Sequence, residues 1–278
     1  MRKRRKIRVA DFLTYLVLIL YAAYVLVPLA IMVMTSMKEN LEFIQDPTGL
    51  PSQLFLDGFR TLFSDSQFFL YLKNSIFITG VSLVFAITFS VLLSYALARY
   101  TGRWVRKWYL FFLAGMIIPI RLGVLFLNDM FNQLHLLNSH WGLILIYIAM
   151  SIPFSMFILT GYIKMIPKEM DEAAYLDGCS TPRLIGSMIV PLVKPAIATV
   201  AIYNFVPIWN DIYFPLIFIF DDSKKTFMLQ VTNFFGQYST DWNLVYSALT
   251  FAAVVSLIFY AFGSKHLVKG LTAGALKG

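Results

Sequence analysis

Residues 75–98 read SIFITGVSLVFAITFSVLLSYALA and contain no Asp, Glu, Lys or Arg. A helix that crosses the hydrocarbon core of a bilayer needs about 20 mostly apolar residues, and this run is long enough. Three further uncharged runs of the same kind cover residues 12–34, 141–163 and 242–264. All four are continuously apolar and lack the period-two alternation of a membrane β-strand. The pattern therefore predicts an all-α membrane protein.

Two more apolar runs have sufficient length, but each holds a single charged residue. Residues 108–127 include Arg121, and residues 195–220 include Asp211. Together with the four uncharged runs they predict six transmembrane helices. The first run of the chain is too long for the apolar core of a secretory signal peptide, so we count it as a span.

The composition excludes several other classes of protein. Of the 278 residues, 59% are hydrophobic and 14% charged, with a mean hydropathy of +0.71, whereas a soluble domain carries roughly 25% charged residues. A soluble enzyme and a disordered protein are therefore disfavoured. Cys179 is the only cysteine, so the chain forms no intrachain disulfide and no cysteine zinc cluster. We expect one membrane domain over residues 1–278 and no soluble domain.

The 23 basic residues, which give a net charge of +8, are unevenly placed along the chain. Most fall in residues 1–8, 99–107, 164–194 and 265–278. Since Lys and Arg concentrate in cytoplasmic segments, this bias places both termini in the cytoplasm. The basic excess is then a topology signal, and nucleic acid is not an expected partner. The opposite side keeps Lys38, Arg60, Lys73, Arg121, Lys224 and Lys225.

The predicted cytoplasmic segment 164–194 carries the clearest local signals, and reads KMIPKEMDEAAYLDGCSTPRLIGSMIVPLVK. Acidic residues crowd the first turn of a short helix, where they complement the helix dipole. Gly178 is placed to end this helix in a left-handed conformation. Thr181 as N-cap and Pro182 at the first position then start a second helix, which Pro191 ends. From these residues alone, the segment is either a solvated loop or a surface for a partner.

The same segment closely resembles the EAA loop of ABC-importer permeases, whose pattern is E-A-A-x3-G-x9-I-x-L-P. The matching positions are Glu172, Ala173, Ala174, Gly178, Met188, Val190 and Pro191, with Met188 and Val190 replacing the isoleucine and the leucine. Residues 209–216 and the ending of the chain are also similar to the carbohydrate-uptake subfamily, typified by the maltose permease.

The resemblance implies an ABC type I importer permease fold with a cytoplasmic coupling helix, as the shorter, six-span partner of a permease pair. It implies that this chain is a non-catalytic subunit for a sugar or oligosaccharide, in the inner membrane of a bacterial or archaeal cell. The implied partners are a homologous second permease, an ABC ATPase dimer, an extracytoplasmic substrate-binding protein and membrane lipid. ATP and Mg would bind to the ATPase, and this chain would bind no cofactor. The solute cannot be named, because specificity in this subfamily resides largely in the binding protein.

The resemblance also implies roles for particular residues in coupling to the ATPase. Glu172 would offer a carboxylate to a basic residue of the ATPase, and Ala173 and Ala174 would allow close approach. Gly178 and Pro191 would shape the turn and the end of the loop. The C-terminal tail would reach the ATPase dimer, or would simply be a frayed terminus; its glycines are Gly270, Gly274 and Gly278.

The fifth predicted span carries polar residues that suit a solute path. A carboxylate within a span is costly and usually faces a cavity or a partner. Aromatic faces beside amide and carboxylate groups suit a sugar, so this set predicts a substrate path or an interface with the second permease. Its aromatic members could instead form an interfacial belt. The set comprises Tyr203, Asn204, Trp209, Asn210 and Asp211.

Other chemistry is weakly supported. Asp129, His135 and His140 lack the spacing of a zinc site, and no metal site is expected. A P-loop motif is absent, so this chain is not expected to bind ATP in that way. We expect Arg121 to reach outward or to pair with Asp129. The alternatives are a secondary transporter, for which no paired repeat is evident, and a membrane-embedded enzyme, for which no catalytic set is convincing.

Overall fold

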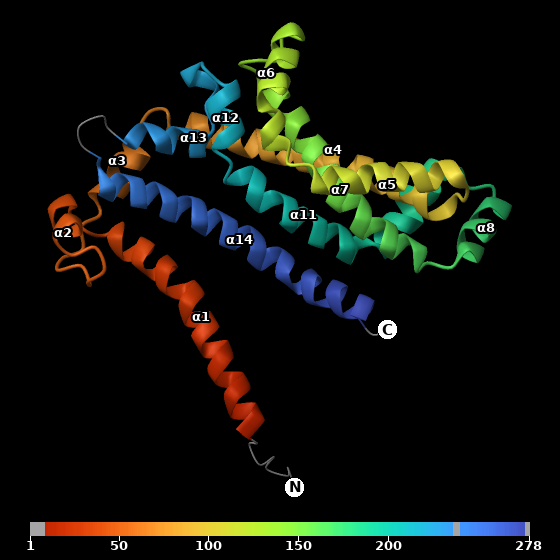
Figure 1. Cartoon of the computed structure of the whole chain (residues 1–278), viewed down its shortest axis with the longest axis horizontal. Helices are drawn as coiled ribbons and strands as arrows, with labels where there is room; N and C mark the ends of the chain where they lie inside the picture. The colour runs from red at the N-terminus through yellow and green to blue at the C-terminus, as the bar shows by residue number, and fades with distance from the viewer. Residues whose placement is uncertain (1–8, 236–239, 276–278) are drawn as a thin grey trace. The chain divides into compact units, whose positions relative to one another are not determined.

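A computed structural model describes the backbone of residues 9–235 and 240–275, and the side chains of residues 11–235 and 240–262. These residues form helices joined by short connections, which confirms the all-α prediction. Figure 1 shows the helices in chain order.

The chain divides into two compact units, each with its own internal packing. One comprises Met1–Ser66 with Val231–Ala253, and the other Gln67–Gln230 with Val254–Gly278. The last helix, α14, begins in the first unit and ends in the second.

Among the described residues, four helices are long and apolar enough to cross a membrane without interruption. Each contains one of the four uncharged runs of the sequence. They are α1 (Val9–Thr35), α4 (Phe68–Arg99), α7 (His140–Lys164) and α14 (Trp242–Ala275).

The predicted span at residues 108–127 is not one continuous helix. The chain turns by 83° between two helical limbs. Pro119 supplies the reason: it lacks an N–H for a helix interior and disfavours helical geometry in the residue before it. Accordingly Ile118 is extended, with ψ at 119°. The limbs are α5 (Arg103–Ile117), then the 3₁₀ turn η1 (Ile120–Gly123) with α6 (Val124–Gln133).

The predicted span at residues 195–220 is also interrupted. Helix α11 (Lys194–Trp209) ends before Asp211, and a short helix, α12 (Tyr213–Phe218), follows. Pro215 has no N–H to donate to the carbonyl of Asp211, and its ring would oppose that carbonyl in a continuous helix. In the first turn of α12 neither defect matters. By length and composition the described helices allow four to six spans, so the six-span count stays a prediction.

In the second unit, α4, α5, α7 and α11 pack as a bundle. The buried face of α4 is rich in small and hydroxyl residues spaced three or four apart, which lets α7 approach closely, as is typical of helices in membranes. The hydroxyl of Ser94 donates a hydrogen bond across this contact to the carbonyl of Met156, at 3.2 Å. The small residues of this face are Ser75, Thr79, Ser82, Ala86, Ser90 and Ser94.

Hydrogen bonds anchor the N-terminal part of α4 to the loop that follows α12. The amide of Asn74 donates to the carbonyls of Ser223 and Lys225, both at 3.0 Å. The side chain of Asn138 accepts from the N–H groups of Phe220 and Asp221. The connecting turns are η3 (Asp222–Lys224), α13 (Phe227–Val231) and η4 (Thr232–Phe234).

In the first unit, Asn243 joins several segments by its side chain. Its amide donates to the carbonyls of Ser36 and Lys38 at 3.0 and 2.7 Å, and its oxygen accepts from the N–H of Gly58 at 2.6 Å. By contrast, the side chains of residues 11–30 on α1 are exposed. The other helices of this unit are α2 (Asn40–Gln45) and α3 (Asp57–Ser64).

Candidate functional site

The segment 164–194 forms the two short helices that the sequence predicts. The second begins one residue earlier than predicted, because Ser180 is its N-cap and Thr181 already lies in the helix. It runs on through a π-turn before it ends. The elements are α8 (Lys168–Leu176), α9 (Thr181–Leu184), the π-turn η2 (Ile185–Ile189) and α10 (Val190–Leu192).

Gly178 ends α8 in the left-handed conformation, with φ at +77°, as predicted. Its N–H donates to the carbonyl of Tyr175 at 3.0 Å, and the N–H of Cys179 donates to that of Ala174 at 2.9 Å. This pair of bonds is a Schellman motif, which satisfies carbonyls at the helix end. A Cβ added at Gly178 would meet nothing within 4 Å. The backbone angle, and not crowding within the chain, therefore favours glycine here.

Pro191 does not end the second helix, contrary to the prediction. It lies inside α10, and the break falls at Val193, just before α11. Pro195 explains the position, because it has no N–H for the carbonyl of Pro191 and its ring would oppose that carbonyl. The chain bends by 80° between Thr181–Leu192 and α11.

The faces of α8 are clearly divided. Asp171 is buried, with 5% of its surface exposed, although it is a carboxylate on a polar helix. Glu172 and Ala173 are exposed, and Ala174 is half-buried. Leu176, at the end of the helix, is 88% exposed. The exposed side of α8 thus combines acidic and small residues with three larger side chains, Met170, Tyr175 and Leu176.

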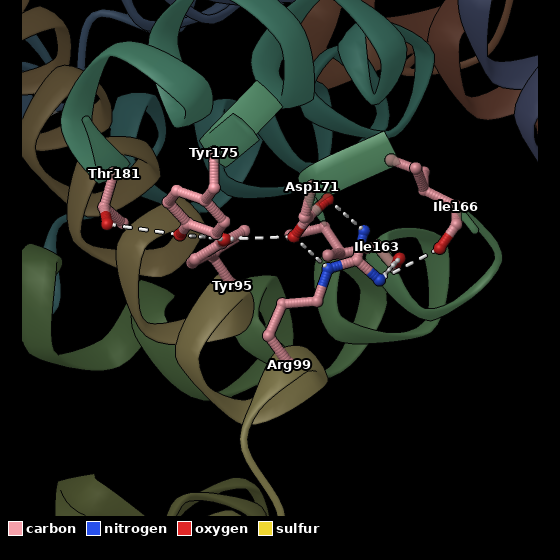
Figure 2. A network of polar contacts seen from close by, with 7 residues as sticks. All are labelled: Tyr95, Arg99, Ile163, Ile166, Asp171, Tyr175 and Thr181. Atoms are coloured by element: carbon pink, nitrogen blue, oxygen red, sulfur yellow. Dashed lines mark hydrogen bonds and ion pairs between the residues drawn. The ribbon is translucent and has the colours of Figure 1, made fainter. Parts of the chain in front are cut away.

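Figure 2 shows what holds Asp171 in its buried place. The guanidinium of Arg99, at the end of α4, binds both carboxylate oxygens: Nε lies 2.7 Å from Oδ2, and Nη2 lies 3.0 Å from Oδ1. Its Nη1 donates to the carbonyls of Ile163 and Ile166, at 3.3 and 2.9 Å. Arg99 therefore joins α4, the end of α7 and α8 at one point.

A chain of hydroxyl groups extends this contact toward α9. The hydroxyl of Tyr95 donates to Oδ2 of Asp171 at 3.0 Å and lies 3.2 Å from the hydroxyl of Tyr175. The hydroxyl of Tyr175 lies 3.2 Å from that of Thr181 (Figure 2). Since each hydroxyl carries one hydrogen, Thr181 donates to Tyr175, and Tyr175 to Tyr95.

Sequence reasoning missed the role of these groups. It assigned Arg99 to the topology signal and Asp171 to the helix dipole. The side chains of both are 8% exposed. Removing one partner of a buried ion pair leaves an uncompensated charge, so replacing either residue alone would destabilise the protein by about 3–5 kcal/mol. The signal in the sequence that could have indicated this role is the position of Arg99, directly after a long apolar run.

The second predicted set, on α11 and the break after it, is only partly brought together. Asp211 caps α12, since the N–H groups of Tyr213 and Phe214 donate to its carboxylate at 3.3 and 3.2 Å. The hydroxyl of Tyr147 donates to its Oδ2 at 2.8 Å. A buried carboxylate is thus satisfied by three donors, as burial requires.

Asp211, Tyr203 and Asn204 line one cavity of about 220 Å³, with Arg121 and Tyr147. Asn204 is buried and its amide donates to the hydroxyl of Ser155 at 2.9 Å. The ring of Tyr203 is half exposed and stacks on Phe154, with centroids 3.6 Å apart.

Trp209 and Asn210 lie elsewhere. Trp209 lines a separate apolar hollow of about 430 Å³, beside Phe205 and Phe259. The amide of Asn210 donates to the hydroxyl of Ser256 on α14 at 3.2 Å. Helical spacing explains the separation, because residues five and six positions after Asn204 point to other sides of α11.

Of the two alternatives predicted for Arg121, the pairing with Asp129 is wrong, and the side chain is 65% exposed. Its Nη2 lies 4.0 Å from Oδ1 of Asp211, and its guanidinium lies over the ring of Tyr213, 5.0 Å from the centroid. Asp129 accepts instead from Gln133, one turn along α6. The bend at Pro119 redirects this part of the chain.

The C-terminal glycines lie at the limit of what the structure describes. Gly270 and Gly274 have helical backbone within α14. Gly278 lies outside the described residues.

The fold and the loop geometry define a class: a multi-pass helical membrane protein with a folded helical loop between two spans. Residues 90–272 match the family of binding-protein-dependent transport system inner membrane components. The chain belongs to this family. It is 31% identical over 283 residues to the multiple sugar-binding transport system permease protein MsmG of Streptococcus mutans, covering 100% of both chains.

Two further similarities agree with this assignment. The chain is 32% identical over 248 residues to the trehalose/maltose transport system permease protein MalG of Thermococcus litoralis, covering 86% of this chain and 88% of that one. Its fold matches a chain of a bacterial ABC transporter involved in the import of the acidic polysaccharide alginate. That match has a TM-score of 0.81 at 18% identity and covers 96% of this chain and 99% of the other. The predicted type I permease fold is thereby confirmed.

Proposed function

We propose that this chain is the transmembrane permease subunit of an ATP-driven importer for a sugar or oligosaccharide. The observation that carries the proposal is the exposed, small and acidic face of α8, held against the ends of α4 and α7 by a buried ion pair. Such a helix is suited to receive movement from a soluble partner. The names of the relatives, which include sugar permeases, support the choice of solute.

The proposed partners are a second, homologous permease, an ABC ATPase dimer and an extracytoplasmic substrate-binding protein. The ATPase would bind ATP and Mg, and this chain would carry out no chemical step. Both termini and α8 would then lie in the cytoplasm, in agreement with the placement of the basic residues. The exposed apolar side chains of α1 support a helix surrounded by lipid or by the second permease.

The exposure and backbone angles of the loop residues support the roles proposed for them. Glu172 and Ala173 are exposed and would contact the ATPase, whereas Ala174 is half-buried and packs inward. Gly178 would set the angle between α8 and α9 through its positive φ. Pro191 belongs to the proposed loop but is placed to shape α10 rather than to touch the ATPase.

The proposed solute path uses the cavity beside the break in the fifth span. Asn204 and Asp211 place polar groups there, and Tyr203 offers an aromatic face. Trp209 and Asn210 are assigned instead to packing or to the interface with the second permease. If alanine at Asn204 and Asp211 together left uptake unchanged, the path would be misplaced.

Reconstitution into proteoliposomes tests the proposed function. The chain is purified with its second permease and ATPase, and labelled oligosaccharides are offered with candidate binding proteins outside the vesicles. We expect uptake that needs internal MgATP and the binding protein. Uptake by this chain alone, driven by an ion gradient, would instead identify a secondary transporter and refute the proposal.

A further inference from the structure

The ion pair between Arg99 and Asp171 differs from the other ion pairs among the described residues. Both of its side chains are 8% exposed, whereas in the pair of Arg60 with Asp57 they are 80% and 53% exposed. A buried pair with four hydrogen bonds from one guanidinium holds its partners in a fixed arrangement, because each planar N–H group has one favourable direction. An exposed pair does not.

The position of this pair in the fold allows it to connect α8 mechanically to the long helices. Asp171 is the buried residue of α8, and Arg99 is the last residue of α4. The same guanidinium donates hydrogen bonds to the carbonyls of Ile163 and Ile166, at the end of α7. One side chain thus connects the long helices α4 and α7 to the short helix α8. Tyr95 adds a second link from α4, one helical turn before Arg99 (Figure 2).

The rest of the segment is attached differently. Helix α9 and the π-turn η2 pack through apolar side chains, including Leu184 and Ile189, in a cluster with Tyr95 and Leu159. Apolar contacts are non-directional and allow small sliding, whereas the bidentate pair fixes distance and orientation. Displacement of α8 would therefore reach α4 in a defined direction through Arg99 and Tyr95, whereas α7 is also joined to α8 by the backbone of residues 165–167.

We propose that Arg99 and Asp171 are positioning residues of the transport cycle, which transmit movement of α8 to the spans α4 and α7. The inference rests on the proposed function, since it needs an ATPase that moves α8. Neither residue touches solute or nucleotide in this role. Their loss would weaken the link between ATP hydrolysis and transport, while the exposed face of α8 would still be available for docking.

The test measures solute molecules imported per ATP hydrolysed, in proteoliposomes that hold the complete complex. A purely structural role would reduce the amount of active complex and lower uptake and hydrolysis in proportion, which leaves this ratio unchanged. For Asp171→Asn we expect the ratio to fall about tenfold, within the range that coupling between two sites commonly spans. Arg99→Lys should lie between this variant and the wild type, because lysine keeps the charge but not the planar fork.

The matched control is Asp57→Asn, which removes the carboxylate from an exposed Arg–Asp pair and should leave the ratio unchanged. If Asp171→Asn does not accumulate in membranes, Tyr95→Phe removes a single hydroxyl from the same joint. We expect that variant to lower the ratio about fivefold, less than Asp171→Asn, because it removes a hydrogen bond to the carboxylate but leaves the ion pair in place.

The outcomes separate the two proposals. A wild-type complex without ATP-dependent uptake would refute the proposed function itself. A wild type that couples normally, together with unchanged ratios in Asp171→Asn or Tyr95→Phe, would overturn only the role of the ion pair.

Discussion

The glycine that ends α8 permits a test of backbone geometry that is separate from side-chain contact. Gly178 has φ at +77°, and an added Cβ would meet nothing within 4 Å. A Cβ at this position therefore clashes with none of the described residues, and we expect a substitution to act through the cost of the left-handed conformation. That cost is roughly 1–2 kcal/mol for an ordinary L-residue, and smaller for Asn, which adopts this conformation more readily.

These costs convert into docking affinities. If the ATPase binds only the loop with the native turn, the apparent dissociation constant rises as the population of that turn falls. A cost of roughly 1–2 kcal/mol corresponds to about a 5- to 30-fold weaker interaction. Gly178→Val should bind the ATPase about 30-fold more weakly than the wild type, Gly178→Ala should lie near the middle of the range, and Gly178→Asn should bind almost as tightly as the wild type.

The assay is titration of purified ATPase onto permease membranes from which the ATPase has been stripped. Permease content, measured in parallel, should be equal for the four proteins, because Gly178 lies outside the long helices. Wild-type affinity in Gly178→Val would contradict the role of the turn. Equal weakening by Asn and Val would show that the size of the side chain, and not the sign of φ, decides docking.

Three further outcomes are expected. Cysteine at Asp57 and at Asp222 should react with an impermeant thiol reagent from outside the cell; failure of either to label would contradict the topology. Glu172→Lys should reduce co-purification of the ATPase by tenfold or more while leaving the permease in the membrane, since reversing one charge of a close pair costs several kcal/mol; wild-type yield and stimulated hydrolysis would favour a solvated loop. Asp211→Ala should lower the unfolding free energy in detergent by about 2–4 kcal/mol, because it removes a helix cap and leaves the hydroxyl of Tyr147 unpaired; Tyr147→Phe, which keeps the cap, should cost less, and equal losses would contradict this account.

The sequence was a good guide where one physical requirement dominates. Residues 75–98 must be a helix, since a long uncharged apolar run has no other stable state in a bilayer. The two bent segments were missed because a hydropathy average treats proline as one more weakly polar residue. Pro119 and Pro215 interrupt hydrogen bonding locally, and their effect depends on where the adjacent turn can form.

The candidate site was predictable to the extent that it is local in sequence. Gly178 could be placed because a helix end and its glycine are neighbours along the chain. The pair of Arg99 and Asp171 could not, because its members are 72 positions apart and each has an ordinary explanation alone. Asp211 was recognised as unusual, but its cap on α12 depends on a break that helical periodicity does not reveal.

The π-turn at Ile185–Ile189 sets the rotational phase between the loop and the following helix. An α-helix turns by about 100° per residue, and a π-turn accommodates one residue more in its ring. With that residue in place, Leu184, Ile189 and Val193 all reach the same apolar cluster. Deleting one residue from Ile185–Ile189 would rotate the residues that follow by about 100° about the axis of this segment. Because the chain then bends by 80°, that rotation would change the direction in which α11 leaves the loop. The phase of this one turn thus sets the direction of the helix that carries Asn204 relative to the loop that carries Glu172.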